Sequence, residues 1–247
     1  MTGLFWLEDG DNPVGTAADH RVRLPGAATR EAAGFVRISG QEATLHVASG
    51  LGFTVDGRDV DAPARLVSDA DGEPTRVRRG SVEFHVIARG GRLAVRVRDA
   101  ENQARRRFPG IASFPIDPAW RIEARFEPHD PPRRRGISGV QGTVQEETFS
   151  GSVVFEAAGG LHRLEAIRER GETDSWIVFG DATNGRETYG AGRFVYAPPP
   201  VGGRTVLDFN KAYNPPCAFT PFSTCPLPPA ENRLTYRVEA GEKFDDS

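Results

Sequence analysis

Short segments in which apolar and polar residues alternate place the strongest constraint on how this chain can fold. In residues 92–98, Leu93, Val95 and Val97 would face one side of a strand while the arginines face the other. The same period of two recurs at 81–88, 121–126, 151–157, 161–167, 176–180 and 233–239. No segment keeps a helical pattern for three turns, and short helices are expected only at 2–8 and 210–213. The sequence therefore predicts a mainly β protein.

Glycine and proline separate these segments and divide the chain. The 28 glycines and 19 prolines are spread along the 247 residues as turn signals. Between Asp99 and Phe108, the eight residues A-E-N-Q-A-R-R-R interrupt the strands without a large apolar side chain. We therefore predict two β units, the first at 1–103 and the second, an antiparallel β-barrel or sandwich, at 104–247.

The charge balance limits the classes of partner. Lys and Arg number 31 against 34 Asp and Glu, which gives a formal net charge of −3 and no overall basic field for nucleic acid. No apolar run reaches the roughly 20 residues that a membrane span needs, and residues 1–11 lack the basic start of an export signal. We expect a cytoplasmic monomer or homodimer without a cofactor, and neither nucleic acid nor membrane as partner.

A proline-rich arm in the second unit carries most of the candidate functional groups. Nine of the 19 prolines fall within 198–229, and because proline lacks an N–H donor, most of this stretch is predicted to be an ordered, irregular arm wrapping the β unit. The candidate ligand-binding residues on or just after it are Asp208, Asn210, Tyr213, Asn214, Cys217, Cys225, Glu231 and Asn232. Preorganised loops often hold binding groups. The alternative is that the acids and amides cap turns while the aromatic rings pin the arm to the scaffold.

A second candidate block covers residues 181–193. It is predicted to be a tight turn at Asn184 and Gly185 between two strands, the second beginning near Glu187. Asp181, Tyr189 and Arg193 of this block complete the candidate binding site. Arg193 is expected to pair with Asp208 or Glu187, and the alternative hypothesis is that it anchors an anionic group of a small ligand. A calcium loop is disfavoured, because Asp181 is the only carboxylate before Gly185.

The two cysteines, Cys217 and Cys225, leave several possibilities open. Seven residues separate them, which matches no zinc spacing, and no metal is expected. A disulfide would stabilise the arm by roughly 2.5 kcal/mol on the loop-entropy model, whereas a reducing compartment favours two buried thiols. A reactive Cys217 would need a base, for which His129 beside Asp130 is the better candidate, although nothing in the sequence places it near Cys217.

Motifs that would assign a reaction are missing from the sequence. It contains no G-x-S-x-G, no glycine-rich phosphate loop, no H-E-x-x-H and no nucleotide fingerprint. Two arginine triplets, at 105–107 and 133–135, are typical of solvated charges rather than of an anion site.

The first unit resembles a forkhead-associated domain, a β-sandwich that binds phosphothreonine. The matching blocks are G-T-A-A-D-H-R-V-R-L-P, T-R-E-A-A-G, V-D-G-R-D-V and R-G-S-V-E-F-H-V-I. In that family an arginine follows the first glycine, and a serine–arginine–x–histidine turn comes later. Here Thr16 follows Gly15, Thr29 stands at the serine, Arg30 is kept, and Ala33 replaces the histidine. The resemblance implies the sandwich, but most of the phosphate clamp is missing.

The second unit resembles the domain-of-unknown-function 1684 family over residues 108–243. The matching blocks are F-P-I-D-P-A-W-R-I-E-A-R-F-E-P-H-D-P-P from Phe114, F-G-D-A-T-N-G-R-E-T-Y-G-A-G-R-F from Phe179, and D-F-N-K-A-Y-N-P-P-C-A-F-T-P-F-S-T-C-P-L-P-P-A-E-N-R-L from Asp208. A family with this name implies no particular activity.

Taken together, these patterns favour binding of a small molecule or a protein partner at the surface formed by residues 181–193 and 208–232. The enzyme alternative is a small-molecule hydrolase or transferase that uses Asp208 as base or Cys217 as nucleophile. A further alternative is an architectural or phosphopeptide-type recognition module. That class predicts no deep polar pocket in the second unit.

Overall fold

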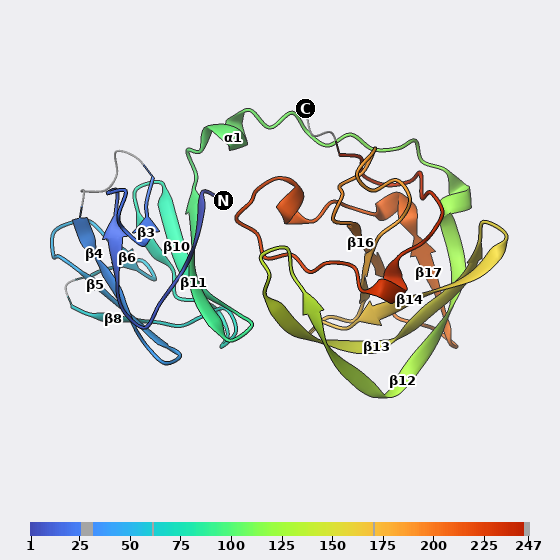
Figure 1. Cartoon of the computed structure of the whole chain (residues 1–247), viewed down its shortest axis with the longest axis horizontal. Helices are drawn as coiled ribbons and strands as arrows, with labels where there is room; N and C mark the ends of the chain where they lie inside the picture. The colour runs from blue at the N-terminus through green and yellow to red at the C-terminus, as the bar shows by residue number, and fades with distance from the viewer. Residues whose placement is uncertain (26–31, 61, 170, 245–247) are drawn as a thin grey trace. The chain divides into compact units, whose positions relative to one another are not determined.

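The structure is a computed structural model that describes residues 1–25, 32–60, 62–169 and 171–244. The chain separates into two compact units, Met1–Pro109 and Gly110–Ser247. Both are built mainly of strands, which confirms the β prediction (Figure 1). The boundary predicted after residue 103 falls within α1 (Gln103–Arg106). None of the helices in the described ranges has the length and apolar character required to cross a membrane.

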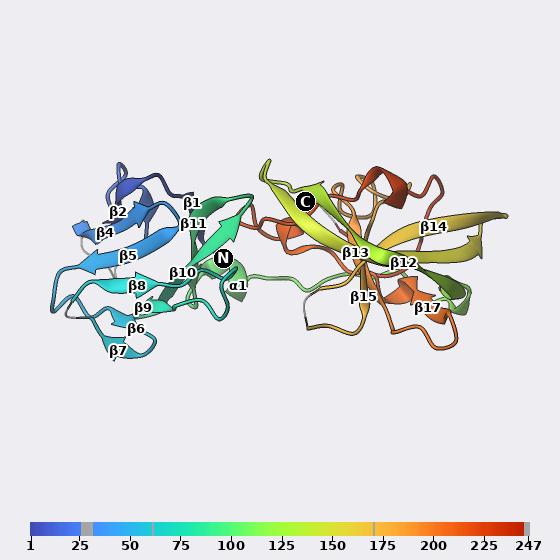
Figure 2. The same cartoon turned by 90° about the horizontal axis from the view of Figure 1, so that it is seen from below.

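The N-terminal unit consists of two facing sheets. Its strands are β1 (Gly3–Trp6), β2 (Gly10–Gly15), β3 (Val22–Arg23), β4 (Ala32–Ser39), β5 (Glu42–Val47), β6 (Thr54–Val55), β7 (Arg58–Asp59), β8 (Ala64–Leu66), β9 (Val77–Arg79), β10 (Val82–Arg89) and β11 (Arg92–Asp99). One sheet has the order β1-β11-β10-β9-β6-β7, and the other has the order β3-β2-β4-β5-β8 (Figure 2). This arrangement is the predicted β-sandwich.

One apolar core holds the two sheets of the N-terminal unit together. Val36 and Leu45 from one sheet and Phe84 and Val95 from the other are almost completely buried in it. The alternation predicted for residues 92–98 is present, because the apolar side chains of β11 are buried while its arginines are exposed or half-buried. Burial of these branched and aromatic side chains supplies the main driving force for the unit.

The helix expected at residues 2–8 is wrong, because this segment forms strand β1. Gly3 and Trp6 pair antiparallel with Val97 and Ala94 of β11. The segment lies at the edge of a sheet, where the hydrogen bonds of the strand ladder replace those of a helix too short to be stable alone.

The C-terminal unit is a single strongly curved sheet that forms an incomplete barrel. Its strands are β12 (Arg121–Ser138), β13 (Val144–Ala157), β14 (Gly160–Ile167), β15 (Ser175–Phe179), β16 (Arg193–Ala197) and β17 (Arg204–Asp208), in the order β16-β15-β14-β13-β12-β17. The long strands β12 and β13 bend across this unit (Figure 1). The edge strand β17 pairs with β12 and also contacts β16, so the sheet curls around an interior core that includes Phe155, Leu164, Ile177 and Phe209.

The proline-rich arm covers a second apolar cluster on the outer face of this sheet. Apart from β17, the arm is irregular, with short 3-10 turns at η3 (Phe209–Lys211) and η4 (Pro216–Ala218) and with η5 (Ala230–Asn232) just beyond its last proline. A further turn, η2 (Pro118–Trp120), precedes β12. The cluster contains Phe149, Trp176 and Phe194 from the sheet, with Tyr213 and Cys225 packed on them from the arm. The predicted wrapping arm is therefore present.

The strand predicted at residues 233–239 is wrong, although its apolar side chains are buried. Leu234 and Val238 lie in the interior core. The main chain does not join the sheet, because Leu234 N–H donates to the carbonyl of Gly180 and Val238 N–H donates to the Asp181 carboxylate. Alternation therefore indicated burial correctly, but these hydrogen bonds go to a turn instead of a neighbouring strand.

Candidate functional site

The structure brings Asp181 and Arg193 together in a completely buried ion pair. Arg193 Nη2 lies 2.9 Å from Asp181 Oδ2, and it also donates to the carbonyl of Val238 at 2.8 Å. Burial lowers the pKa of Arg193, while the Asp181 carboxylate acts in the opposite direction. The partner is therefore Asp181 rather than the expected Asp208 or Glu187. The pair fastens the C-terminal segment to the barrel.

The turn after β15 differs from the predicted hairpin. The returning strand β16 begins at Arg193 and not near Glu187. Asp181 Oδ1 accepts hydrogen bonds from the main chain and hydroxyl of Thr183, at 2.8 and 2.6 Å, and Asn184 Oδ1 accepts one from the main chain of Asp181 at 2.7 Å. These bonds stabilise an irregular turn, which is why the chain rejoins the sheet later than expected.

The side chains of Asn214 and Asn232 also form hydrogen bonds with main-chain groups. Asn214 Nδ2 donates to the carbonyl of Lys243 at 2.9 Å. Asn232 Nδ2 donates to the carbonyls of Glu165 and Val178, and its Oδ1 accepts from Glu165 N–H at 2.7 Å. Both residues are buried. They join the arm and the C-terminal segment to the barrel.

Asp208, Asn210 and Tyr213 lie at the start of the arm. The Asp208 carboxylate caps η3 by accepting from Asn210 N–H at 3.2 Å. Asn210 Nδ2 donates to the carbonyl of Asp117 at 2.9 Å. The Tyr213 ring packs edge-on against Phe194, and burial raises the pKa of its hydroxyl. This geometry corresponds to the capping and pinning roles that the sequence left open.

Cys217 and Cys225 are neighbours within the arm and are not joined by a disulfide. The Cys217 N–H lies 3.3 Å from Cys225 Sγ, and Tyr189 donates its hydroxyl to the carbonyl of Cys217 at 3.2 Å. The contact with the Cys225 thiol, together with burial, raises the pKa of Cys217. A raised pKa makes the Cys217 thiolate less accessible, which disfavours a nucleophilic role for this residue.

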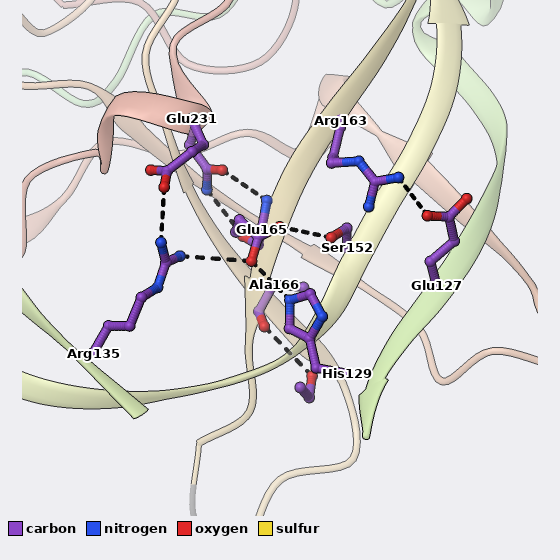
Figure 3. A network of polar contacts seen from close by, with 10 residues as sticks. Glu127, His129, Arg135, Ser152, Arg163, Glu165, Ala166 and Glu231 are labelled. Atoms are coloured by element: carbon purple, nitrogen blue, oxygen red, sulfur yellow. Dashed lines mark hydrogen bonds and ion pairs between the residues drawn. The ribbon is translucent and has the colours of Figure 1, made fainter. Parts of the chain in front are cut away.

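A network of charged side chains that the sequence did not predict as a site lies on the outer face of β12, β13 and β14 (Figure 3). At its centre, the Glu165 carboxylate accepts from Ser152 Oγ at 2.6 Å and lies 2.8 Å from His129 Nε2. Arg135 Nη2 lies 3.5 Å from Glu165, and Arg135 Nη1 donates to Glu231 at 2.8 Å. We call these five residues, with Asn232 bracing the main chain of Glu165, the Glu165 network.

The Glu165 network keeps its central carboxylate ionised. Burial by itself raises the pKa of Glu165, but hydrogen bonds from Ser152 and His129 and the charge of Arg135 outweigh it, so the pKa lies below its ordinary value. A hydrogen bond from the main-chain N–H of Glu231 itself, and after it the bond from Arg135, lower the pKa of Glu231. In the described ranges, no group of three or more His, Cys, Asp or Glu side chains is arranged to hold a metal ion.

Arg135 forms part of the lining of a groove beside the network. Its guanidinium carbon lies 4.1 Å from the centre of the buried Phe149 ring, and this cation–π contact holds the guanidinium over the ring. The groove has a volume of about 430 Å³. Its lining residues are Arg135, Gly136, Ile137 and Ser138 of β12, Phe149 of β13, and Leu227, Pro228, Pro229, Ala230, Glu231 and Arg233.

One wall of the groove is a strand edge that has no neighbouring strand among the residues that the structure describes. β13 pairs with residues 133–138 on one side, whereas β17 pairs only with residues 121–125. The carbonyl of Ser138 accepts Leu227 N–H at 2.8 Å, so it points away from β13. Because antiparallel strands alternate the direction of their main-chain groups, those of Gly136 and Arg134 point the same way. We call these outward groups of Arg134 and Gly136 the free edge of β12.

Two prolines explain why the free edge stays unpaired. After Leu227, the arm continues through Pro228 and Pro229, which have no N–H to donate. The arm therefore leaves β12 at this point. In the described part of the chain, no other segment hydrogen-bonds to the outward main-chain groups of Arg134 or Gly136.

Comparisons with known proteins place the second unit in a family. The family model "Protein of unknown function (DUF1684)" matches residues 106–243, more than half of the chain. The chain belongs to this family. An uncharacterized protein of Haloarcula marismortui, solved by solution NMR, is 30% identical with a TM-score of 0.50, over 58% of this chain and 80% of that one. No curated protein matches the chain.

Two solved forkhead-associated domains match less closely. One, from a study of phosphothreonine-dependent interactions of such domains, is 24% identical with a TM-score of 0.26, over 40% of this chain and 96% of that one. The other, named Rv0020c_FHA, is 21% identical with a TM-score of 0.27, over 38% and 90%. Of the positions compared above, Thr29 and Arg30 lie outside the described residues, and Ala33 is buried.

Of the residues predicted from the sequence, Glu231 joins the Glu165 network directly and Asn232 braces it, while the others hold the arm or the C-terminal segment in place. The signal for Glu165 was present but not used. It is a lone carboxylate in the buried segment Leu164 to Ile167, and a buried charge requires partners. His129 was noted beside Asp130, but it pairs with Glu165 instead.

Proposed function

We propose that the C-terminal unit is a binding module, and that its ligand lies in the groove between β12 and residues 227–233. The observation that carries this proposal is the coincidence of an unpaired strand edge with a guanidinium held flat on Phe149. Here the arm leaves the sheet, and Arg135 and Glu231 keep 36% and 51% of their side-chain surface exposed. Groups that are both fixed and accessible are what ligand recognition requires.

The accessibility of its charges favours the groove over the turn at 181–193. Asp181 and Arg193 have no exposed side-chain surface, and their hydrogen bonds hold the C-terminal segment. A ligand would reach them only after that segment had detached. The residues predicted at 208–232 thus contribute to binding through Glu231 and through the arm that forms the second wall of the groove.

The Glu165 network supports binding better than hydrolysis. A serine nucleophile must reach its substrate and needs a strong enough base, but Ser152 is completely buried, and the Glu165 carboxylate that accepts its hydroxyl has a lowered pKa. The network therefore fixes a negative charge behind Arg135. It orients that guanidinium toward the groove and leaves Ser152 inactive.

Amide-resolved NMR of the full-length protein tests this proposal with three simple probes. Benzoate, phenyl phosphate and benzamide present a carboxylate, a phosphate and a neutral amide on the same ring. We expect the two anions to shift the amide signals of residues 135–138 and 227–233, and Arg135→Gln to abolish these shifts. Arg163→Gln is the matched control, because Arg163 is an exposed arginine of the same sheet paired with Glu127.

Two results would overturn the proposal. One is a set of shifts confined to residues outside the groove, and the other is the absence of shifts at millimolar probe. If Arg135→Gln disturbs the spectrum as a whole, Glu231→Gln provides the second variant. It removes the carboxylate that competes for Arg135 and should enlarge the anion-induced shifts.

A further inference from the structure

We infer that the occupant of the groove is an extended acidic peptide that adds to the free edge of β12 as a further strand. This inference rests on the proposed function and names the class of partner. Edge addition joins main-chain hydrogen bonds, which give affinity, to side-chain contacts, which give selectivity. The structure supplies both parts.

The main-chain contribution comes from a hydrogen-bond ladder that starts along the edge of β12 and then stops. The Leu227 N–H bond to Ser138 and the bridge between Gly139 and Pro226 show that a chain can pair antiparallel along this edge. The prolines end the pairing, and the outward groups of Gly136 and Arg134 remain available. Gly136 and Arg134 are both exposed. A peptide strand would continue the ladder from the point where the arm leaves it.

The charge part is an excess of accessible arginine. Residues 133–138 and 227–233 contain four arginines, Arg133, Arg134, Arg135 and Arg233, against one carboxylate, Glu231, which pairs with Arg135. The facing strand β13 adds two carboxylates, Glu146, which pairs with Arg134, and Glu147, which lies opposite Arg135 in the ladder. Both pairs are largely solvated and therefore weak, so incoming carboxylates can compete for these arginines.

The pleat of β12 predicts the pattern of the peptide. Arg133 and Arg135 share the face of Phe149, since Arg133 lies directly opposite Phe149 in the ladder. The alternate face carries Val144, an apolar residue that is 55% exposed and lies beside Gly136, and it also carries Arg134, which pairs with Glu146. A bound strand would direct every second side chain to Arg133 and Arg135, and the others across Gly136 toward Val144. The preferred sequence therefore alternates acidic and apolar residues.

Arginines on a strand edge also have a simpler use, which is to prevent unwanted association of sheets. In that role the arginines only discourage pairing with other strands, and the edge has no affinity for any extended peptide. The two roles therefore differ in whether an acidic strand binds. A direct titration separates them.

The test uses a capped, fluorescein-labelled heptapeptide of alternating glutamate and valine, titrated with the full-length protein and followed by fluorescence polarisation. We expect saturable binding that weakens with salt, and no binding of the peptide in which lysine replaces glutamate. Glu231→Gln releases Arg135 and should tighten binding about two- to fivefold. Methylation of every second peptide nitrogen on the pairing side should remove binding.

A pair of variants isolates the main-chain contribution. Arg134→Ala and Arg134→Pro lose the same charge, but the proline also loses the outward N–H and places its ring on the free edge. We expect Arg134→Pro to bind at least about tenfold more weakly than Arg134→Ala, the effect of one main-chain hydrogen bond. The inward ladder to β13 does not use this N–H, so the sheet itself should be retained.

The outcomes separate the two proposals. Equal binding by Arg134→Pro and Arg134→Ala, or full binding of the methylated peptide, would overturn strand addition. If no peptide binds while benzoate and phenyl phosphate still shift groove amides, the peptide inference fails and the proposed function stands. If Arg134→Pro does not fold, the methylated peptide on the unaltered protein decides.

Discussion

The substitution Asp181→Asn breaks one side of the buried ion pair without altering the size of the side chain. Asp181 Oδ1 accepts from Thr183 and from Val238 N–H, while Oδ2 faces the Arg193 guanidinium. The asparagine oxygen can keep the first set of bonds, but its NH₂ group then faces the guanidinium. Arg193 would be left as a buried charge whose remaining carboxylate, Glu242, makes no direct ion pair with it among the described contacts.

The expected loss follows from the burial of both partners. Each has no exposed side-chain surface, and removing one partner of such a pair typically costs about 3–5 kcal/mol of unfolding free energy. The second substitution, Arg193→Met, removes the stranded charge. The double variant Asp181→Asn with Arg193→Met should therefore be destabilised by clearly less than the sum of the two single changes.

Urea unfolding followed by hydrogen exchange of peptides covering residues 176–196 and 234–244 measures this loss in the C-terminal unit alone. Exchange in the second peptide should rise first, since the pair fastens that segment. The control is Glu187→Gln, which removes an exposed carboxylate paired with Arg237 and should leave the midpoint nearly unchanged. The reasoning is refuted if Asp181→Asn behaves like this control.

Three further outcomes follow from the described contacts. Folding lowers the pKa of Glu165, so this carboxylate stabilises the fold above its ordinary pKa of 4.5, and the stabilisation is lost as pH falls through the folded value. In Glu165→Gln, the midpoint urea concentration should therefore fall less steeply between pH 5 and 3 than in the unaltered protein. Since Cys225 and burial raise the pKa of Cys217, iodoacetamide at pH 7 should modify native Cys217 far more slowly than the unfolded chain, as read by intact mass. Gly192→Ala should lower the melting temperature well below that of Gly185→Ala: both glycines have positive φ, but only at Gly192 would a methyl group lie 2.5 Å from Pro228.

Much of the architecture followed from local pattern. Alternation at 92–98 and 161–167 reports which side chains face a core, and in both segments the predicted strand is present. The same signal failed at 233–239, because burial of Leu234 and Val238 does not reveal where their main chain finds its hydrogen bonds. Pattern predicts burial, while pairing depends on neighbours that are distant in sequence.

The candidate site was harder to predict for the same reason. The arm was recognisable from its prolines, but whether Asp208 or Asn214 faces a ligand or the main chain is decided by backbone geometry that no residue pattern encodes. The Glu165 network joins Ser152, His129 and Glu231 from separate strands and from the arm. Ser152 lies directly opposite Glu165 in the ladder of β13 and β14, so these contacts depend on strand pairing and on the path of the chain after the arm, which local pattern does not show.

The hydrogen bonds from Arg193 to the carbonyl oxygens of Val238 and Ala240 have a consequence for the folding of the newly synthesised chain. While the ribosome is still adding residues before Val238, the guanidinium on β16 lacks these acceptors, and the barrel cannot close around it. A nascent chain halted or clipped ahead of that point would expose both the interior core and a stranded charge. Residues 238–240 therefore have to be in place before the C-terminal unit can bury Arg193 and complete its interior core.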